Sequence, residues 1–241
     1  MSEHVQSSIH ELADRLFNEN KTRTSFRPIR DALRPATMAA GYQVQDLLNA
    51  RYTEDGRGSI AGYKVGLTSE KIRELCGVHE PIAGTIYQST VHRSPATINL
   101  ADFMHLGIEF ELAVEIAKDI PLDAAPLDAV SVRDFIAACV PAFELIDDRN
   151  ADYGDLDALS IMVDNSWCGG IVLGEAVGDW RALDFETTPS YSLEVTVTDG
   201  GAFTAVAVAF RNMARSAVQL GTSRSSWSSP HFRLTLDCEI D

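Results

Sequence analysis

Residues 107–116 read GIEFELAVEI, and this alternation constrains the fold more than any other stretch of the chain. Apolar side chains fill every second position, and the glutamates at 109, 111 and 115 stand between them. Because successive side chains of a β-strand point to opposite faces, a strand here has one apolar and one acidic face. The segment therefore predicts a long strand that packs one face against a core.

The rest of the pattern predicts an α+β protein with a mixed β-sheet core. Further strands are expected at 59–67, 82–87, 140–147, 167–173 and 191–198, with helices at 9–17, 37–48, 70–76 and 129–138. Strands and helices do not alternate regularly, which argues against a doubly wound parallel sheet. We expect a helical N-terminal region over 1–58, a mixed β catalytic core over 59–220 and an atypical serine-rich tail over 221–241.

Composition excludes several functions. The 241 residues carry a formal net charge of −15, which repels nucleic acids and anionic membranes. No stretch approaches the roughly 20 apolar residues of a membrane span, and the charged N-terminus does not resemble a secretory signal. The four cysteines are widely spaced, without a CxxC pair. We therefore expect a cytoplasmic protein with reduced thiols, and no nucleic-acid or membrane partner.

Two strands offer carboxylates for a metal site. Glu109 and Glu111 share a strand face at a spacing of about 6.6 Å, so they can converge on one ion. Glu144 lies within the apolar run 140–146 and is predicted to be buried, where a carboxylate must take up a proton or meet a cation. Two interpretations without a metal are the alternatives. Glu109 and Glu111 can belong to an acidic strand face exposed to water, and Glu144 can pair with a structural arginine such as Arg149.

A lysine stands within another apolar run. Lys64 shares its strand face with Ile60, Gly62 and Gly66, and the two glycines leave room for a ligand to approach the ammonium group. Such a lysine needs a carboxylate or a substrate anion nearby. The alternative is a salt-bridged core lysine without a catalytic role.

The charges of these four residues fit a divalent cation. Three carboxylates around a divalent ion sum to −1, and Lys64 brings the group to zero. All-oxygen ligands favour Mg²⁺ or Mn²⁺ over zinc, and the positions left open would suit a 2-oxo acid that chelates through its carboxylate and adjacent oxygen. Histidine metal motifs, nucleophile elbows and phosphate-binding glycine loops do not occur in a convincing setting.

Four segments also resemble one known family. They are AGYKVGLTS at 61–69, LGIEFELAV at 106–114, PAFELIDDR at 141–149 and VDNSWCGGIVLG at 163–174. In this order they resemble the 2-keto-4-pentenoate hydratase and 4-oxalocrotonate decarboxylase branch of the fumarylacetoacetate hydrolase superfamily. The resemblance extends from about residue 5 to about residue 198. It implies a mixed β core, a Mg²⁺ or Mn²⁺ site at Glu109, Glu111 and Glu144, a catalytic Lys64, and homo-oligomers.

The resemblance also implies a reaction. This is the hydration of 2-hydroxypenta-2,4-dienoate (2-keto-4-pentenoate) to 4-hydroxy-2-oxopentanoate in the meta-cleavage pathway of aromatic catabolism, with Asp164 and Ser166 helping to orient the substrate. Decarboxylation of 4-oxalocrotonate is the first alternative, because both reactions pass through a metal-stabilised dienolate. Hydrolysis of a C–C bond in an acylpyruvate is a third and less favoured alternative.

The C-terminus departs from the family. After an expected helix at 212–220, the family continues into a strand that ends in a Thr-Gly pair, and this pair helps to hold the substrate carboxylate. The segment from Gly221 onward has no such pair and is rich in serine. A catalytically impaired homologue that builds oligomers therefore stands as the alternative from another functional class.

Overall fold

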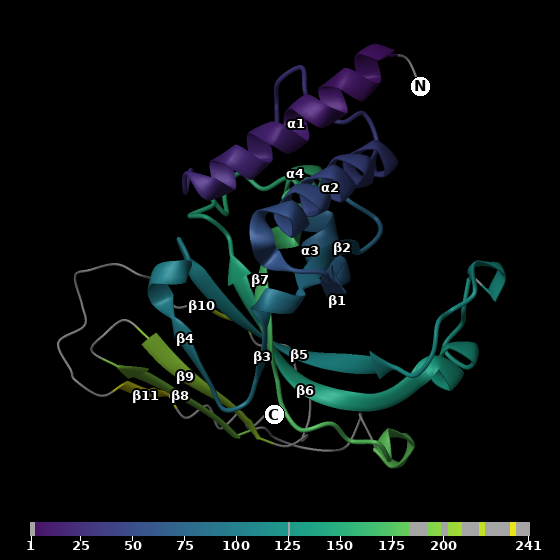
Figure 1. The fold of residues 1–241 in the computed structure, drawn as a ribbon, viewed down its shortest axis with the longest axis vertical. Helices are drawn as coiled ribbons and strands as arrows, with labels where there is room; N and C mark the ends of the chain where they lie inside the picture. The colour runs from purple at the N-terminus through teal and green to yellow at the C-terminus, as the bar shows by residue number, and fades with distance from the viewer. Residues whose placement is uncertain are drawn as a thin grey trace.

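Helices gather at one end of the molecule, and the two larger β-sheets lie at the other end, in the computed structural model (Figure 1). The structure describes residues 3–124, 126–183, 192–198, 202–208, 217–219 and 232–234. Its helices are α1 (Glu3–Lys21), α2 (Met38–Tyr52), α3 (Glu70–Leu75) and α4 (Ala158–Val163). Among these described residues, no helix is both long and apolar enough to span a bilayer.

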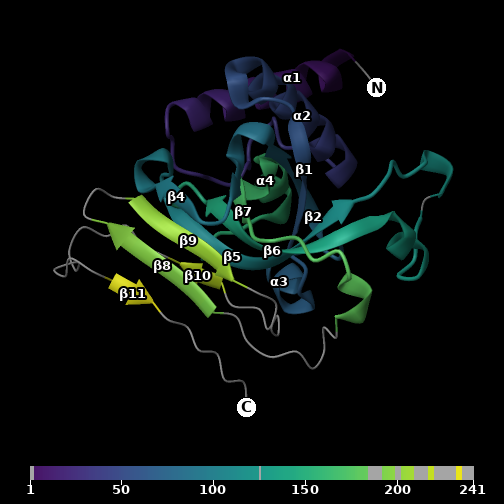
Figure 2. The same cartoon turned by 60° about the horizontal axis from the view of Figure 1, so that its bottom comes forward.

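The strands form three sheets. A two-stranded sheet pairs β1 (Ile60–Gly66) with β2 (Ile82–Tyr87). A five-stranded sheet has the order β10 (Ala217–Gln219), β5 (Leu106–Ile116), β6 (Ile136–Asp147), β7 (Cys168–Leu173) and β3 (Val91–Arg93). A four-stranded sheet has the order β11 (Phe232–Leu234), β8 (Ser192–Thr198), β9 (Ala202–Val208) and β4 (Ala96–Asn99), and Figure 2 brings it forward.

The predicted fold class is confirmed. Strands β3 and β7 pair in parallel, whereas β5, β6 and β7 pair antiparallel, so the largest sheet is mixed. Short turns of 3-10 helix join the strands at Gln88–Thr90, Leu100–Asp102, Leu122–Ala124, Ser131–Phe135, Asn165–Trp167 and Trp180–Ala182, and a π-helical turn at Thr53–Arg57 follows α2.

The helices pack through apolar side chains at helical spacing. On α1 these are Ile9, Leu12 and Leu16, which are buried against α2 in a core cluster that also includes residues of α4. Thr37 accepts a hydrogen bond from the backbone N–H of Ala40, so a side-chain cap fixes the start of α2. The Gln45 amide donates to the carbonyls of both Ala83 and Met162, which ties α2 to β2 and α4. The helical layer thus holds the two-stranded sheet in place.

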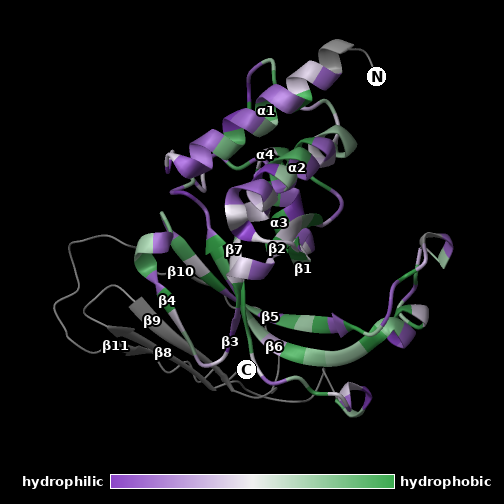
Figure 3. Cartoon of the chain, in the orientation of Figure 1, coloured by the Kyte–Doolittle hydropathy of each residue, from purple (hydrophilic) through white to green (hydrophobic). Residues whose placement is uncertain are grey.

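Strand β5 follows the alternation of its sequence. Its N-terminal half packs into a core with β4, β6 and β7, where Ile108, Phe143, Leu145 and Val172 are buried. Both β5 and β6 are largely apolar in Figure 3 and extend together well beyond the helices. The glutamates lie on the opposite face of this hairpin.

Two predicted helices are wrong where the structure describes them. Residues 129–138 contain a short turn and then the start of β6, because Ile136 and Ala138 pair with the end of β5. Residues 217–219, within the helix expected at 212–220, form β10 and pair with β5, while 212–216 lie outside the described residues. In both places, backbone pairing with a long neighbouring strand overrides local helical preference.

Candidate metal centre

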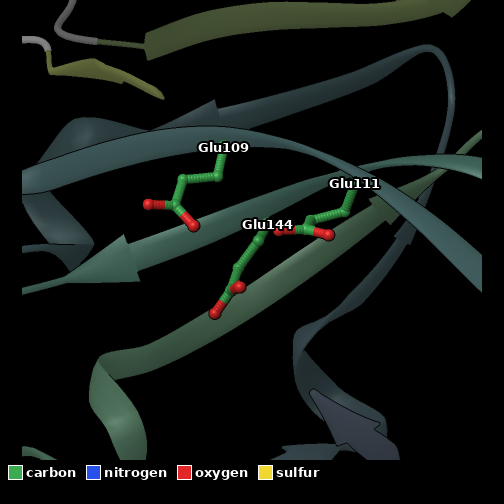
Figure 4. Close-up of side chains that lie close together, drawn as sticks. All are labelled: Glu109, Glu111 and Glu144. Atoms are coloured by element: carbon green, nitrogen blue, oxygen red, sulfur yellow. The ribbon is translucent and has the colours of Figure 1, made fainter. Parts of the chain in front are cut away.

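Three glutamates converge on one face of the β5–β6 hairpin. Glu109 on β5 lies directly opposite Glu144 on β6, and Glu111 follows two residues along β5 on the same face. Oxygens from the three carboxylates all lie within 4.8 Å of one another (Figure 4). Glu144 is buried, whereas the other two are half-buried. Side chains that repel one another are therefore held together by strand register.

Lys64 reaches this cluster from the other sheet. Its Nζ lies 2.9 Å from Oε1 of Glu144, and the two side chains are only 11% and 5% exposed. An apolar cluster that includes Ile86 of β2 and Ala142 of β6 joins the two sheets. Since Lys64 pairs with Gly84 across β1 and β2, this packing also delivers the ammonium group to the glutamates.

The electrostatics of the cluster favour a cation. Burial raises the pKa of Glu144 to about 7, and the negative charges of Glu109 and Glu111 add to the rise, although Lys64 opposes it. Burial alone would lower the pKa of Lys64, but Glu144 reverses this effect and the pKa is raised. Apart from Lys64, Oε1 of Glu144 has no hydrogen-bond partner among the described residues. This oxygen keeps a lone pair for a further positive group.

The residues present fit a hard divalent cation. The donor set consists of carboxylate oxygens, which Mg²⁺ and Mn²⁺ prefer over softer ligands. Three carboxylates and one ammonium carry a net charge of −2, which one divalent ion would cancel. One buried and two half-buried side chains leave the cluster reachable from one side. The structure thus contains a possible carboxylate metal site.

The alternatives at these residues can now be compared with the structure. Arg149 is not the partner of Glu144: its Nη2 lies 2.6 Å from Asp164 instead. Lys64 is indeed a salt-bridged core lysine, but its partner belongs to the acidic cluster, so the structural and functional interpretations coincide there.

Asp164 and Ser166 lie beside β2 and bond to the protein itself. Asp164 accepts hydrogen bonds from Asn20 at 2.9 Å and from Arg149, while the Ser166 hydroxyl donates to the Ala83 carbonyl at 2.8 Å. Residues 165–167 all have left-handed backbone angles, with φ between 51° and 58°. Ser166 thus ties this strained turn to β2, the partner strand of Lys64, whereas Asp164 ties its start to α1 and Arg149. Their predicted role in orienting the substrate stays a prediction.

Two neighbours of the cluster escaped the sequence analysis. The thiol of Cys168 is buried among the charged groups, and burial, followed by the charge of Glu144, raises its pKa to about 12. Asn165 bonds the backbone of Thr85 through both ends of its amide, at 2.7 and 2.9 Å, and so fixes the turn to β2. Both residues lie within the segment 163–174 that carries the family resemblance, but their contacts join segments distant in the sequence, so the sequence alone assigned neither of them a role.

Named relatives agree with this architecture. No protein family model matches the chain. The chain is 27% identical over 180 residues to the TodF product hydratase of Pseudomonas putida F1, a match that covers 75% of this chain and 65% of that protein. It is 27% identical over 174 residues to the 2-keto-4-pentenoate hydratase of Paraburkholderia xenovorans, covering 72% of this chain and 63% of the relative. The chain thus spans less than two thirds of the length of these hydratases.

A decarboxylase is similar in both sequence and fold. The chain is 28% identical over 194 residues to a 4-oxalocrotonate decarboxylase of a Pseudomonas species, covering 80% of this chain and 66% of that protein. The solved structure of 4-oxalocrotonate decarboxylase from Pseudomonas putida G7, complexed with magnesium and adipate, superposes with a TM-score of 0.70. That likeness covers 90% of each chain at 19% identity and shows the fold alone.

The sequence likeness to hydratases and a decarboxylase, together with the shared fold, supports the predicted resemblance to the 2-keto-4-pentenoate hydratase and 4-oxalocrotonate decarboxylase branch of the fumarylacetoacetate hydrolase superfamily.

Proposed function

We propose that the protein is a Mg²⁺- or Mn²⁺-dependent hydro-lyase that converts 2-hydroxypenta-2,4-dienoate into 4-hydroxy-2-oxopentanoate in aromatic meta-cleavage catabolism. The observation that carries the proposal is the cluster of three glutamates within 4.8 Å of one another, beside a lysine ion-paired to the buried one. The names of the relatives supply the reaction class.

Glu109, Glu111 and Glu144 would hold the cation. When bound, the ion supplies positive charge next to the substrate carboxylate and the C2 oxygen, where negative charge develops during ketonisation. The carboxylates would balance that charge and would hold the cation on the face of the β5–β6 hairpin that carries them.

Lys64 would supply the proton chemistry of the site. Its raised pKa keeps Nζ protonated at neutral pH, so the side chain acts as a hydrogen-bond donor and a positive charge near the C2 oxygen. Its burial beside Glu144 excludes water from the ammonium group and strengthens both effects. Asp164 and Ser166 would influence substrate orientation through this turn, which Asp164 bonds to Arg149 and Ser166 bonds to β2.

A second candidate reaction is the decarboxylation of a 4-oxalocrotonate-type 2-oxo acid. The longest of the sequence matches given above, and the fold match over 90% of both chains, are to decarboxylases. Both reactions stabilise the same kind of dienolate, so the glutamate cluster serves either one. The substrate is a small 2-oxo acid in both cases.

A metal titration of turnover tests the proposal. Purified protein is mixed with the dienol, and the loss of dienol absorbance is followed at increasing Mg²⁺; we expect metal-dependent loss. Glu109→Gln and Glu144→Gln each remove one anionic ligand and should abolish it. Glu115→Gln is the matched control, because Glu115 shares the β5 face but lies outside the cluster. Full turnover in either ligand variant, with unchanged Mg²⁺ affinity, would refute the site.

The same assay separates the other candidates. Metal-dependent release of CO₂ from 4-oxalocrotonate, without hydration of the dienol, would favour the decarboxylase. No reaction with either substrate at any metal concentration would favour a catalytically impaired, oligomer-forming homologue. We also propose that the protein is cytoplasmic and forms homo-oligomers. The oligomeric state is tested by the molar mass of the purified protein, measured by light scattering.

A further inference from the structure

We propose that a second cavity, distinct from the glutamate cluster, binds a small oxyanion such as a carboxylate or phosphate. The cavity has a volume of about 340 Å³, within the usual range for small-molecule sites. Its walls come from the end of α2, from β3 and β4, and from the turn that precedes β7. The three clustered glutamates and Lys64 are not among its lining residues.

The aspartates on the cavity wall are already engaged. Asp147 accepts hydrogen bonds from the backbone N–H groups of Met104 and His105, and Asp164 is bonded by Asn20 and Arg149. Asp102 is exposed to water. The carboxylates that line the cavity are therefore already stabilised by hydrogen bonds or by water and do not require a bound cation.

Arg57 lines the cavity and forms no ion pair with the described residues. Its guanidinium lies 3.9 Å from the ring centroid of Tyr52 and 5.7 Å from that of Tyr87. In the part of the chain that the structure describes, no carboxylate lies within ion-pair distance of it. By contrast, Arg34 and Arg51 each meet an aspartate. Stacking on an aromatic face orients the guanidinium and leaves its N–H groups available to an anion.

Further polar side chains line the same cavity as Arg57. Among them are the Ser89 hydroxyl and the His92 imidazole. A guanidinium fork with neutral donors around it matches the oxygens of a carboxylate or a phosphate. The net charge of −15 repels anions at long range, so it is the local charge of Arg57 that favours an anionic ligand in this cavity.

Binding of anions to metal-free protein tests this site. Without a metal, the three glutamates repel an anion, so binding at the cluster needs the cation while binding at Arg57 does not. Metal-free protein is titrated calorimetrically with acetate and, separately, with inorganic phosphate in a chloride buffer. We expect saturable one-site binding, and the tighter of the two anions identifies the natural class of ligand.

Variants locate the binding. Arg57→Gln should weaken it by about tenfold or more, as expected for loss of a charged hydrogen-bond donor. Arg57→Lys keeps the positive charge but loses the two-pronged guanidinium group, so it should weaken anion binding less than Arg57→Gln does. The lysine variant also allows the test if the glutamine variant fails to fold. Arg27→Gln is the control, since Arg27 is exposed and lies outside the cavity.

Two results would overturn the inference. One is the absence of saturable binding of either anion to the wild-type protein, and the other is equal affinity in the wild-type protein and the Arg57 variants. Glu109→Gln should bind the anion normally even though it should lose metal-dependent turnover. Failure of the proposed function and failure of this site therefore give different patterns.

Discussion

At the scale of single residues, Lys64 and Glu144 depend on each other. Each is a buried charge, and their 2.9 Å ion pair offsets the cost of removing both from water. A lysine held in this way also serves the proposed chemistry, because its proton and its charge stay at a defined position.

Lys64→Ala is expected to lower kcat by about 10²- to 10⁴-fold, the usual range for loss of a positioned acid or base. Mg²⁺ affinity should change much less, because the three carboxylates remain. Steady-state kinetics and a calorimetric Mg²⁺ titration of the same preparation measure both quantities. Unchanged turnover would remove Lys64 from the mechanism.

The lowered pKa of Asp157 leads us to expect that the stability of the folded protein depends on pH. Burial raises its pKa, but hydrogen bonds from Arg34 and Ser160 outweigh this and lower the pKa to about 2, from 3.8. A carboxyl group whose pKa is lowered on folding stabilises the protein above its unfolded pKa, and this stability is lost as the pH falls from about 4 towards 2. After allowance for solvent screening, the pair contributes on the order of 1–2 kcal/mol at pH 7.

Asp157→Asn keeps a side-chain cap for α4 but removes the charge. Urea denaturation should show the variant to be less stable than wild type at pH 7, with a difference that shrinks between pH 4 and pH 3. A difference that stays constant over this range would show that the ion pair is not its source.

At the scale of elements, the turn at 165–167 and strand β2 approach each other closely. A Cβ atom on Gly84 would lie 2.6 Å from the carbonyl oxygen of Asn165 and 3.1 Å from Cβ of Ser166. Gly84 is also the pairing partner of Lys64. The absence of a side chain there lets the strained turn support the strand opposite the lysine.

Gly84→Ala should destabilise the protein by about 1–3 kcal/mol, because backbone must move to admit the methyl group. Gly62→Ala is the matched control, since a Cβ atom at Gly62 on β1 meets nothing within 4 Å. Urea denaturation of both variants provides the comparison. Equal stability of the two would show that the contact at Gly84 is not tight in solution.

The accuracy of the sequence analysis also varied between elements. Residues 107–116 were predicted as a strand because their period-2 pattern admits one interpretation, and β5 covers them. Residues 129–138 had no such pattern, and pairing with β5 decided their structure. The short strands β3 and β4 were not expected, because three or four residues carry too little periodicity to be recognised.

At the scale of the whole molecule, metal binding at the glutamate cluster, as proposed, would be coupled to folding. The glutamates come from both strands of a hairpin, and the neighbouring lysine comes from a different sheet, so the cluster exists only in the folded chain. A ligand that binds the folded state alone stabilises it in proportion to the logarithm of its concentration.

Mg²⁺ at about 100 times its dissociation constant should therefore add about 2.7 kcal/mol of stability, or about 5–10 °C in Tm. Glu144→Gln should remove most of this shift. Thermal unfolding with and without Mg²⁺ measures it. An equal rise in both proteins would indicate that the ion acts elsewhere on the acidic surface.

The sequence by itself determined the acidic face of β5, the burial of Glu144 and the apolar setting of Lys64, because periodicity and composition are local properties. Which charges meet depends on the tertiary structure. It pairs Glu144 with Lys64 rather than Arg149, assigns Arg149 to Asp164, and stacks Arg57 on Tyr52 without a carboxylate partner among the described residues. These choices depend on strand register and on packing between distant segments, which no local pattern encodes.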